Sequence, residues 1–371
     1  MINSEKIPLV DLKAQYRSLK TEIDIAISQC VDDSNFIRGK SVGSFEASFS
    51  EYLGAKFCIG CGNGTDALEI ILKSLKIGAG DEVIVPALTW IATAEAVNNV
   101  GAEPVFVDIN PANFTIDHTK IKDKITKKTK AIIPVHLYGS PADMSEILTL
   151  AEEGGLFVIE DCAQAHGSEY KGQKIGTFGI ASAFSFFPSK NLGAFGDAGA
   201  IVTNSKEVAD NARMITNHGQ LLERHAHSII GRNSRLDTIQ AAILNVKLPF
   251  LDKWNESRRG VANNYMSDLK ASSELLLPQL ENDKKHVFHL FVIRTQIREK
   301  IMAALNDSNI SCGIHYPKAL PFLDAYRYKK HKMTDFPVSS KITNEILSIP
   351  VYPEITQEQV GRICNTINKC M

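Results

Sequence analysis

Short apolar runs alternate with amphipathic stretches between residues 45 and 245. The runs are rich in β-branched and aromatic residues and are bounded by Gly, Pro, Asp or Asn, as buried strands usually are. They lie at 82–90, 104–109, 130–139, 156–161, 181–187 and 199–204. Segment 65–75 places Leu68, Leu72 and Leu75 on one helical face. This alternation predicts an α/β fold in which helices cover both faces of a mainly parallel sheet.

The pattern changes after residue 250. It predicts a long helix at 251–269, a strand at 286–295, a helix at 297–309 and a closing helix that starts near Thr356. We therefore expect two domains, a large ligand-binding domain at 1–250 with an N-terminal helical arm and a smaller α/β domain at 251–371. Ligands of open α/β sheets collect at the carboxyl ends of the strands, so we expect the site there.

Composition and charge exclude several classes of function. The 371 residues carry a net charge of −1, which gives no basic field for nucleic acid or an anionic membrane. No apolar run reaches the ~20 residues of a membrane span, and the N-terminus has no signal-peptide pattern, so we expect a cytoplasmic protein. Cys58 and Cys61 have CxxC spacing, but no second pair or nearby His completes a ligand set. We expect them to be structural and expect no metal site.

Two residues could carry amine and carboxylate chemistry. Asp161 ends the apolar strand LFVIED, and Lys190 lies between a buried strand and the glycine-rich turn NLGAFGDAGA. Partial desolvation there could lower the pKa of the lysine and free its amine. A strand-end Asp is also a common helix cap, and a lone Lys in a turn is usually solvated.

A glycine turn runs into a helix at 61-CGNGTDAL-68. Free backbone N–H groups and the helix dipole at such a start favour a phosphate, although a simple cap is the commoner reason for a Gly-Thr start. Ser185 could add a hydroxyl to the same phosphate. Trp90 could cover a flat ligand by stacking, whereas most strand-end tryptophans are packing residues.

Taken together, these blocks resemble the DegT-type nucleotide-sugar aminotransferases, a branch of the fold-type I pyridoxal 5′-phosphate (PLP) enzymes. The resemblance covers nearly the whole chain in collinear order: GNGTDAL (62–68), PVHLYGSPADM (134–144), EDCAQAHG (160–167), SFFPSKNLGAFGDAGA (185–200), GRNSRLDTIQAAIL (231–244), GIHYP (313–317) and SIPVYPEIT (348–356). It implies a fold-type I architecture, with a mainly parallel mixed sheet in the large domain.

The resemblance implies roles for individual residues. Lys190 matches the lysine that forms a Schiff base with PLP, and Asp161 the carboxylate on the pyridine nitrogen. The other implied cofactor contacts are Gln164 near the phenolic oxygen, Gly64, Thr65 and Ser185 at the phosphate, Trp90 on the ring, and Asn233 reaching the phosphate from the neighbouring subunit of a homodimer.

The implied substrate contacts are His315, Tyr316 and Arg224. His166 is a further candidate, as a base near the substrate or as a satisfied structural imidazole. One position departs from the family pattern, because Phe187 stands where a Tyr often lies three residues before the lysine. Without that hydroxyl, we expect the orientation of the sugar to depend more on His315, Tyr316 and Arg224.

The implied reaction moves an amino group from L-glutamate to a nucleotide-linked keto-sugar. The motifs look closest to the branch that aminates C3 of dTDP-linked 3-keto-6-deoxyhexoses, with C4 amination and UDP-linked sugars as alternatives. A dehydratase on this fold would have histidine in place of Lys190. A non-catalytic PLP-binding regulator should add a DNA- or partner-binding element, which the sequence lacks. A nicotinamide-dependent oxidoreductase would need a dinucleotide fingerprint, which is also missing.

Overall fold

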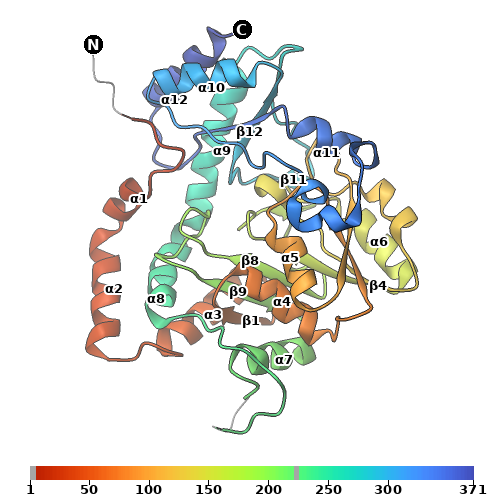
Figure 1. Ribbon diagram of the computed structural model, residues 1–371. Coiled ribbons are helices and arrows are strands. Elements are labelled where there is room, and N and C mark those ends of the chain that lie inside the picture. Colours follow the sequence, from red (N-terminus) through yellow and green to blue (C-terminus); the bar gives the residue numbers. More distant parts are fainter. Residues whose placement is uncertain (1–5, 221–224) are drawn as a thin grey trace.

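A seven-stranded sheet forms the centre of the computed structural model, which describes residues 6–220 and 225–371. The strand order is β1-β9-β8-β5-β4-β2-β3 (Figure 1). The strands are β1 (Phe57–Cys61), β2 (Glu82–Pro86), β3 (Glu103–Val107), β4 (Thr129–Ile132), β5 (Phe157–Asp161), β8 (Ala181–Ser185) and β9 (Gly199–Thr203).

The sheet is mainly parallel. Strands β3, β2, β4, β5 and β8 pair in parallel, whereas β9 runs antiparallel to both β8 and β1. This arrangement confirms the predicted α/β fold with a mixed sheet. It also adds β1, which the sequence analysis missed because its five residues, FCIGC, show neither alternation nor β-branched enrichment beyond Ile59.

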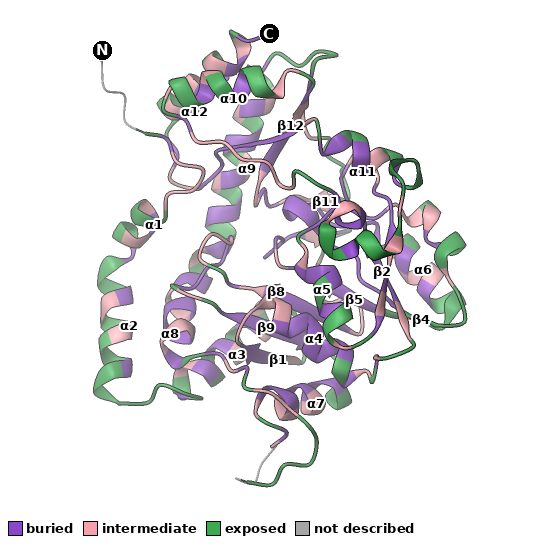
Figure 2. Cartoon of the chain, in the orientation of Figure 1, coloured by how far each residue is buried: buried purple, intermediate pink, exposed green. Residues whose placement is uncertain are grey.

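Helices cover both faces of the sheet, and the strands between them are buried (Figure 2). Apolar side chains of α3, α6 and α8 share one core cluster with one face, and those of α4, α5 and α7 share another with the opposite face. The helices are α3 (Lys40–Leu53), α4 (Gly64–Ser74), α5 (Ala92–Asn99), α6 (Met144–Gly154), α7 (Lys206–Thr216) and α8 (Thr238–Lys247).

A second, smaller core lies beyond the long helix α9 (Leu251–Asp268). The three-stranded sheet β10-β12-β13 packs there with two helices. Thr356 caps the last helix with a reciprocal capping box, as its position predicted. The elements are β10 (Leu275–Leu276), β12 (Phe291–Thr295), β13 (Ile346–Ile349), α10 (Arg298–Asp307) and α12 (Gln357–Asn368).

The chain then returns toward the first core. Leu320, Tyr326 and Phe336 belong to the same apolar cluster as α4 and α5, and the helix α11 (Pro337–Ile342) starts against the carboxylate of Asp108. The domain boundary at residue 250 stays a prediction. Three short 3₁₀ helices lie in this returning segment: Leu320–Phe322, Asp324–Lys329 and Met333–Asp335. Four others lie earlier in the chain: His118–Lys120, Lys122–Lys124, Leu137–Gly139 and Leu248–Phe250.

Three predicted strands are at least four residues shorter than expected, and the run 82–90 is a strand only to Pro86. The run 130–139 forms a strand only to Ile132, since Pro134 has no N–H to donate, and a 3₁₀ turn follows at Leu137–Gly139. The run 286–295 is a strand only from Phe291 onward. The N–H groups of Val287 and Leu290 instead donate to carbonyls of that turn.

The remaining elements lie at the edges. Helices α1 (Leu12–Ser18) and α2 (Lys20–Asp32) form the predicted N-terminal arm, and α2 packs on α8 through Leu19 and Ile23. A small sheet joins β6 (Glu169–Tyr170), β7 (Gln173–Lys174) and β11 (Lys284–Lys285). Within residues 6–220 and 225–371, no helix combines the length and apolar character needed to cross a bilayer.

Candidate active site

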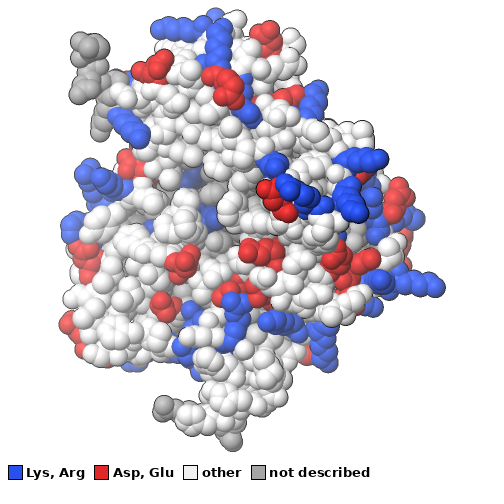
Figure 3. Space-filling model, in the orientation of Figure 1, with Lys and Arg blue, Asp and Glu red and all other residues white. Residues whose placement is uncertain are grey.

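A cavity of about 700 Å³ opens where several strands of the large sheet end. The space-filling view is hollowed near the middle of this face, and Lys or Arg atoms are visible inside (Figure 3). Its lining draws on the turns after β1, β2, β5 and β8 and on the segments around residues 289 and 315. The predicted residues in this lining are Gly64, Thr65, Trp90, Asp161, Gln164, Ser185, Lys190, His315 and Tyr316.

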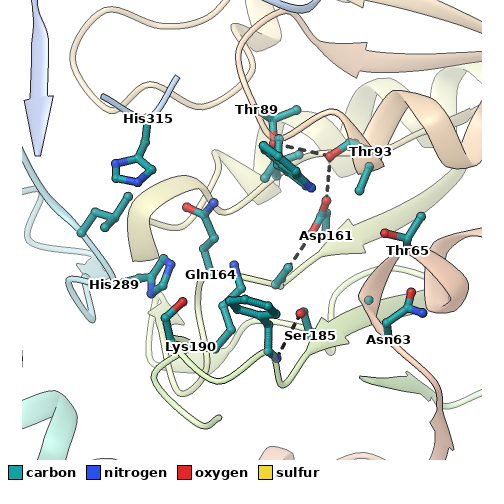
Figure 4. A pocket seen from close by; sticks show the side chains of 18 of the residues that line it. Asn63, Thr65, Thr89, Thr93, Asp161, Gln164, Ser185, Lys190, His289 and His315 are labelled. Atoms are coloured by element: carbon teal, nitrogen blue, oxygen red, sulfur yellow. Dashed lines mark hydrogen bonds between the residues drawn. The ribbon is translucent and has the colours of Figure 1, made fainter. Parts of the chain in front are cut away.

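Asp161 is the last residue of β5, and its carboxylate is fixed by two donors. The Thr93 hydroxyl donates to Oδ2 at 2.8 Å and the Ala163 N–H donates to Oδ1 at 3.1 Å (Figure 4). Burial raises the pKa of Asp161, while these two hydrogen bonds and the positive charge of Lys190 act in the opposite direction. A cation placed in the cavity would complete the electrostatic surroundings of this carboxylate.

Lys190 follows β8 in a tight turn, where its N–H donates to the Phe187 carbonyl at 2.9 Å. Burial of the ammonium group lowers the pKa of Lys190 to about 8, although the negative charge of Asp161 opposes this. The neutral amine is therefore far more abundant near neutral pH than in an ordinary lysine, whose pKa is 10.5. Such an amine can attack an aldehyde.

The start of helix α4 presents backbone N–H groups to the same cavity. The Asn63 side chain caps the helix by accepting from the Asp66 N–H at 2.8 Å, whereas the N–H groups of Gly64 and Thr65 have no acceptor within the helix. A Cβ on Gly64 would lie 2.7 Å from Cβ of Ser185, so only glycine allows this approach of the helix to β8. The helix start and the Ser185 hydroxyl thus form a cradle for an anion.

Aromatic and amide groups line another wall. The Trp90 ring is 57% exposed, and its centroid lies 5.4 Å from that of Tyr316 with the planes tilted by 44°. The Gln164 Nε2 donates to the Tyr316 hydroxyl at 3.0 Å, and its Oε1 accepts from the Tyr138 N–H at 2.8 Å. These contacts hold Gln164 and Tyr316 in place, and Trp90 is left free to cover a flat ligand.

His315 also lines the cavity, with its Nδ1 2.9 Å from the Ser348 hydroxyl. The Tyr138 hydroxyl donates to the His315 carbonyl. Burial, and secondarily the charge of Lys190, lower the pKa of His315. Figure 4 shows His315 on the side of the cavity opposite Asn63 and Thr65 at the start of α4. Its neighbour Tyr316 also lines the cavity.

Two predicted residues lie outside the cavity lining, and a third falls outside the described residues. His166 is fully buried, with its ring 5.5 Å from both Phe184 and Phe186, and it does not belong to the cavity lining. Its expected contact with the substrate is therefore wrong, because the core covers the imidazole. Asn233 is exposed and outside the lining, and Arg224 lies outside the described residues.

Asn63, Thr93 and His289 also line the cavity but are not predicted from the sequence. Asn63 could have been found, because an Asn before a Gly-Thr helix start is a strong cap. Thr93 reaches Asp161 from 68 residues away, a contact that no local pattern signals. His289 lies in a segment read as a regular strand, and its position on the cavity depends on the irregular path of residues 286–290.

Two groups of side chains are of types that can bind a metal, and both have structural roles. His136, Glu160 and Cys162 bring ligand atoms within 4.8 Å of one another, but protein N–H groups already occupy both Glu160 oxygens. Cys58 and Cys61 are buried on β1, and burial raises the pKa of both thiols. Neither cysteine is a thiolate at neutral pH.

Several curated proteins and solved structures are similar to this chain along nearly its whole length. A UDP-N-acetyl-3-dehydro-α-D-glucosamine 3-aminotransferase from Acidithiobacillus ferrooxidans is 43% identical over 371 residues, which cover 100% of both chains. A dTDP-3-amino-3,6-dideoxy-α-D-galactopyranose transaminase from Aneurinibacillus thermoaerophilus is 43% identical over 98% of this chain and 99% of that one. The crystal structure of Streptomyces venezuelae DesV in complex with a ketimine intermediate matches with a TM-score of 0.96 at 39% identity, covering 99% of this chain and 98% of that one. The model of the DegT/DnrJ/EryC1/StrS aminotransferase family matches residues 17–368, and the chain belongs to this family.

Proposed function

We propose that this enzyme, a PLP-dependent sugar aminotransferase, moves an amino group from L-glutamate to C3 of a dTDP-linked 3-keto-6-deoxyhexose. The observation that carries the proposal is the meeting of three groups in one cavity: the amine of Lys190, the carboxylate of Asp161 and the free N–H groups at the start of α4. An amine, a carboxylate and an anion cradle are the groups that PLP needs from a protein.

The lining of the cavity offers the groups that the cofactor needs. Asp161 would pair with the ring nitrogen, the α4 cradle with Ser185 would hold the phosphate, and Trp90 would cover the ring. When bound, PLP accepts the amino group of the donor and passes it to the acceptor ketone, while its ring withdraws electrons from the carbon that loses a proton. Asp161 keeps the ring nitrogen protonated, and the low dielectric around it strengthens that pair.

Lys190 has two tasks in this scheme. Its neutral amine holds the cofactor through the aldehyde carbon, and after release the same amine moves a proton to or from the reacting carbon. The lowered pKa of about 8 suits both tasks, because the amine must be available as a base near neutral pH.

The names of two relatives support the choice of C3. The A. thermoaerophilus enzyme and the A. ferrooxidans enzyme are both named for nitrogen at C3 of their sugars, one dTDP-linked and the other UDP-linked. Their identities to this chain are the same, 43%, so identity does not separate the two nucleotides. A UDP-linked sugar and amination at C4 are the alternatives to the dTDP sugar.

The same proposal includes a homodimer that shares each active site. Arg232 is paired with Asp66 of α4 at 2.7 Å, and the Ser234 hydroxyl accepts from the Gly62 N–H at 3.0 Å. Asn233 lies between these two anchored residues and is exposed, which supports the proposed contact with a neighbouring molecule. Ile230, three residues before Asn233, is 95% exposed, so a neighbouring molecule that covered it would bury apolar surface.

Lys190→Ala tests the central claim. The purified wild-type protein should absorb visible light when PLP is added, and excess L-glutamate should bleach this absorbance as the amino group moves to the cofactor. Lys190→Ala should lose both the absorbance of the lysine–cofactor bond and all turnover. Lys171→Ala, which removes an exposed lysine, is the matched control and should behave as the wild type. Full turnover by Lys190→Ala would contradict the proposal, and bleaching by no donor would favour a regulator.

A comparison of sugars tests the substrate. Enzyme loaded with the amino form of the cofactor is mixed with dTDP- or UDP-linked sugars that carry a ketone at C3 or C4, and the return of the visible absorbance is followed. We expect the dTDP-linked 3-keto sugar to give the highest kcat/KM. A higher value for any of the other three sugars would replace the substrate while leaving the reaction in place.

A further inference from the structure

A buried chain of amide hydrogen bonds connects His289 to the residue that follows Lys190. The Asn191 amide nitrogen donates to the Val287 carbonyl at 3.0 Å and to Oδ1 of Asn255 at 2.8 Å. The Asn255 amide nitrogen in turn donates to the His166 carbonyl at 2.8 Å. Because a backbone carbonyl can only accept, both amide groups have one possible orientation.

This orientation fixes the proton on the His289 ring. The remaining polar atom of Asn191 is Oδ1, an acceptor, and it lies 3.2 Å from Nδ1 of His289. The Nδ1 atom must therefore carry the proton, and in a neutral imidazole Nε2 then has only its lone pair. No described residue donates to Nε2.

The surroundings of His289 keep the ring neutral. Burial lowers the pKa of His289 well below its usual range, and the positive charges of Lys190 and Arg258 lower it further. The other ionisable groups that act on it are His166 and His315, and they also lower the pKa. The ring is therefore neutral near neutral pH, and its Nε2 is a hydrogen-bond acceptor.

His289 and the amine of Lys190 share one side of the cavity. His289 and Lys190 both line the cavity, and Figure 4 shows the imidazole beside the lysine side chain. Asn191 holds the imidazole and is also the next residue after Lys190, so one short segment sets the positions of both groups. Asn191 and Asn255 are each 2% exposed, which shields this connection from water.

We propose that His289 is a positioning residue whose Nε2 accepts a hydrogen bond from the free amine of Lys190 and aims the amine lone pair at the carbon that exchanges its proton. This inference rests on the proposed function. In the half-reactions Lys190 is released from the cofactor, and a flexible side chain with a free amine would otherwise sample several rotamers. A hydrogen bond from one N–H to Nε2 leaves the lone pair of the amine free to take the proton.

The proton on the ring can be observed without any activity. Long-range ¹H–¹⁵N spectra of protein with ¹⁵N-labelled histidine distinguish Nδ1–H from Nε2–H, and the His289→Gln spectrum assigns the signal. We expect a neutral Nδ1–H ring from pH 6 to pH 9 in the holoenzyme. An Nε2–H ring or a protonated ring in this range would overturn the inference, whether or not the proposed sugar is the substrate.

Half-reaction kinetics test the effect on Lys190. In single turnovers with L-glutamate, His289→Leu should lower the maximal rate roughly 10- to 100-fold, the usual cost of a hydrogen bond to a charged or reacting group, with little change in the half-saturating concentration. His289→Gln places an amide oxygen near the former Nε2 and should recover most of the rate. Equal losses in the Leu and Gln variants would overturn the positioning role.

Two further variants separate positioning from packing. His286 lies three residues earlier, stacks on Phe288 at 4.0 Å and is outside the cavity lining, so His286→Leu is the matched control and should keep the half-reaction rate. Asn191→Asp puts a carboxylate against Nδ1, which should raise the pKa of His289, so that a proton occupies Nε2 at a higher pH than in the wild type. Its half-reaction should slow at the pH values at which the long-range spectra show a protonated Nε2. An unchanged rate in a variant with protonated Nε2 would overturn the inference, and so would an equal loss in His286→Leu.

Discussion

Glu160 and Asp161 are consecutive carboxylates on β5, yet the fold uses them in opposite ways. Successive residues of a strand point to opposite faces, and both side chains are almost fully buried. Glu160 accepts from His136, at 3.1 Å, and from the N–H groups of Gly176, Phe178 and Gly179. Asp161 has two donors and faces the cavity.

The difference shows how a fold separates structure from chemistry. Four donors consume the hydrogen-bonding capacity of Glu160, which joins β5 to the loop around residues 176–179. Asp161 has only two donors, so its carboxylate can still accept hydrogen bonds from a ligand. Burial raises the pKa of Asp161. An incompletely compensated buried charge costs stability in the empty protein and gives a strong interaction when the opposite charge arrives.

Asp161→Asn should produce the largest effect. An amide in place of the carboxylate cannot hold the ring nitrogen protonated, so kcat should fall roughly 100- to 1,000-fold, as for the loss of one preorganised electrostatic partner. In the cofactor-free protein the same variant should be at least as stable as the wild type at pH 8. The pKa of Asp161 is raised in the fold, so the wild-type residue stabilises the fold at low pH and loses that contribution as the pH rises.

Thermal unfolding of the cofactor-free variants at pH 4 and pH 8, together with single-turnover rates, checks both parts. A variant that loses stability at pH 8 while keeping its rate would reverse the assignment of the two carboxylates.

Glu160→Gln should give the complementary result. The amide nitrogen would face N–H groups that need an acceptor, so the free energy of unfolding should fall by about 3 kcal/mol, in the range for a broken buried pair. The specific activity of the folded, cofactor-loaded fraction should stay close to that of the wild type. Denaturation curves and active-site titration measure the two quantities. A large loss of rate per active site would mean that Glu160 also acts on the chemistry.

The pH dependence of cofactor capture extends the comparison to Lys190. Only the neutral amine attacks the aldehyde, so the rate of PLP capture by the cofactor-free protein should rise with pH with a midpoint near the pKa of about 8, far below the ordinary value of 10.5. Asp161→Asn removes the negative charge that raises the pKa of Lys190, so its midpoint should be lower still. Stopped-flow absorbance gives both midpoints. A wild-type midpoint near 10 would show that the amine is solvated.

The sequence could predict Asp161 but not the role of its neighbour. A carboxylate at the end of an apolar strand, followed by a lysine and a glycine turn, resembles a family pattern, and the strand periodicity placed it at the right edge of the sheet. Glu160 receives its donors from His136 and from a loop more than 15 residues away, so its saturation depends on tertiary structure. Similarly, the irregular path of residues 286–290 comes from hydrogen bonds to a distant turn and hides His289 from a strand pattern.

Phe187→Tyr should give the smallest effect and tests the acceptor side of the cavity. Phe187 lines the cavity and is 52% exposed, so a hydroxyl at this position would point into or near the space for the sugar. One added hydrogen bond between neutral groups should lower KM for the keto-sugar about 2- to 10-fold and leave the glutamate half-reaction unchanged. Phe195→Tyr, at another partly exposed phenylalanine that is outside the cavity lining, is the matched control and should change neither constant. A change confined to the glutamate half-reaction would place the hydroxyl beside the amino donor. Among the described residues predicted to contact the substrate, only His315 and Tyr316 would then orient the sugar.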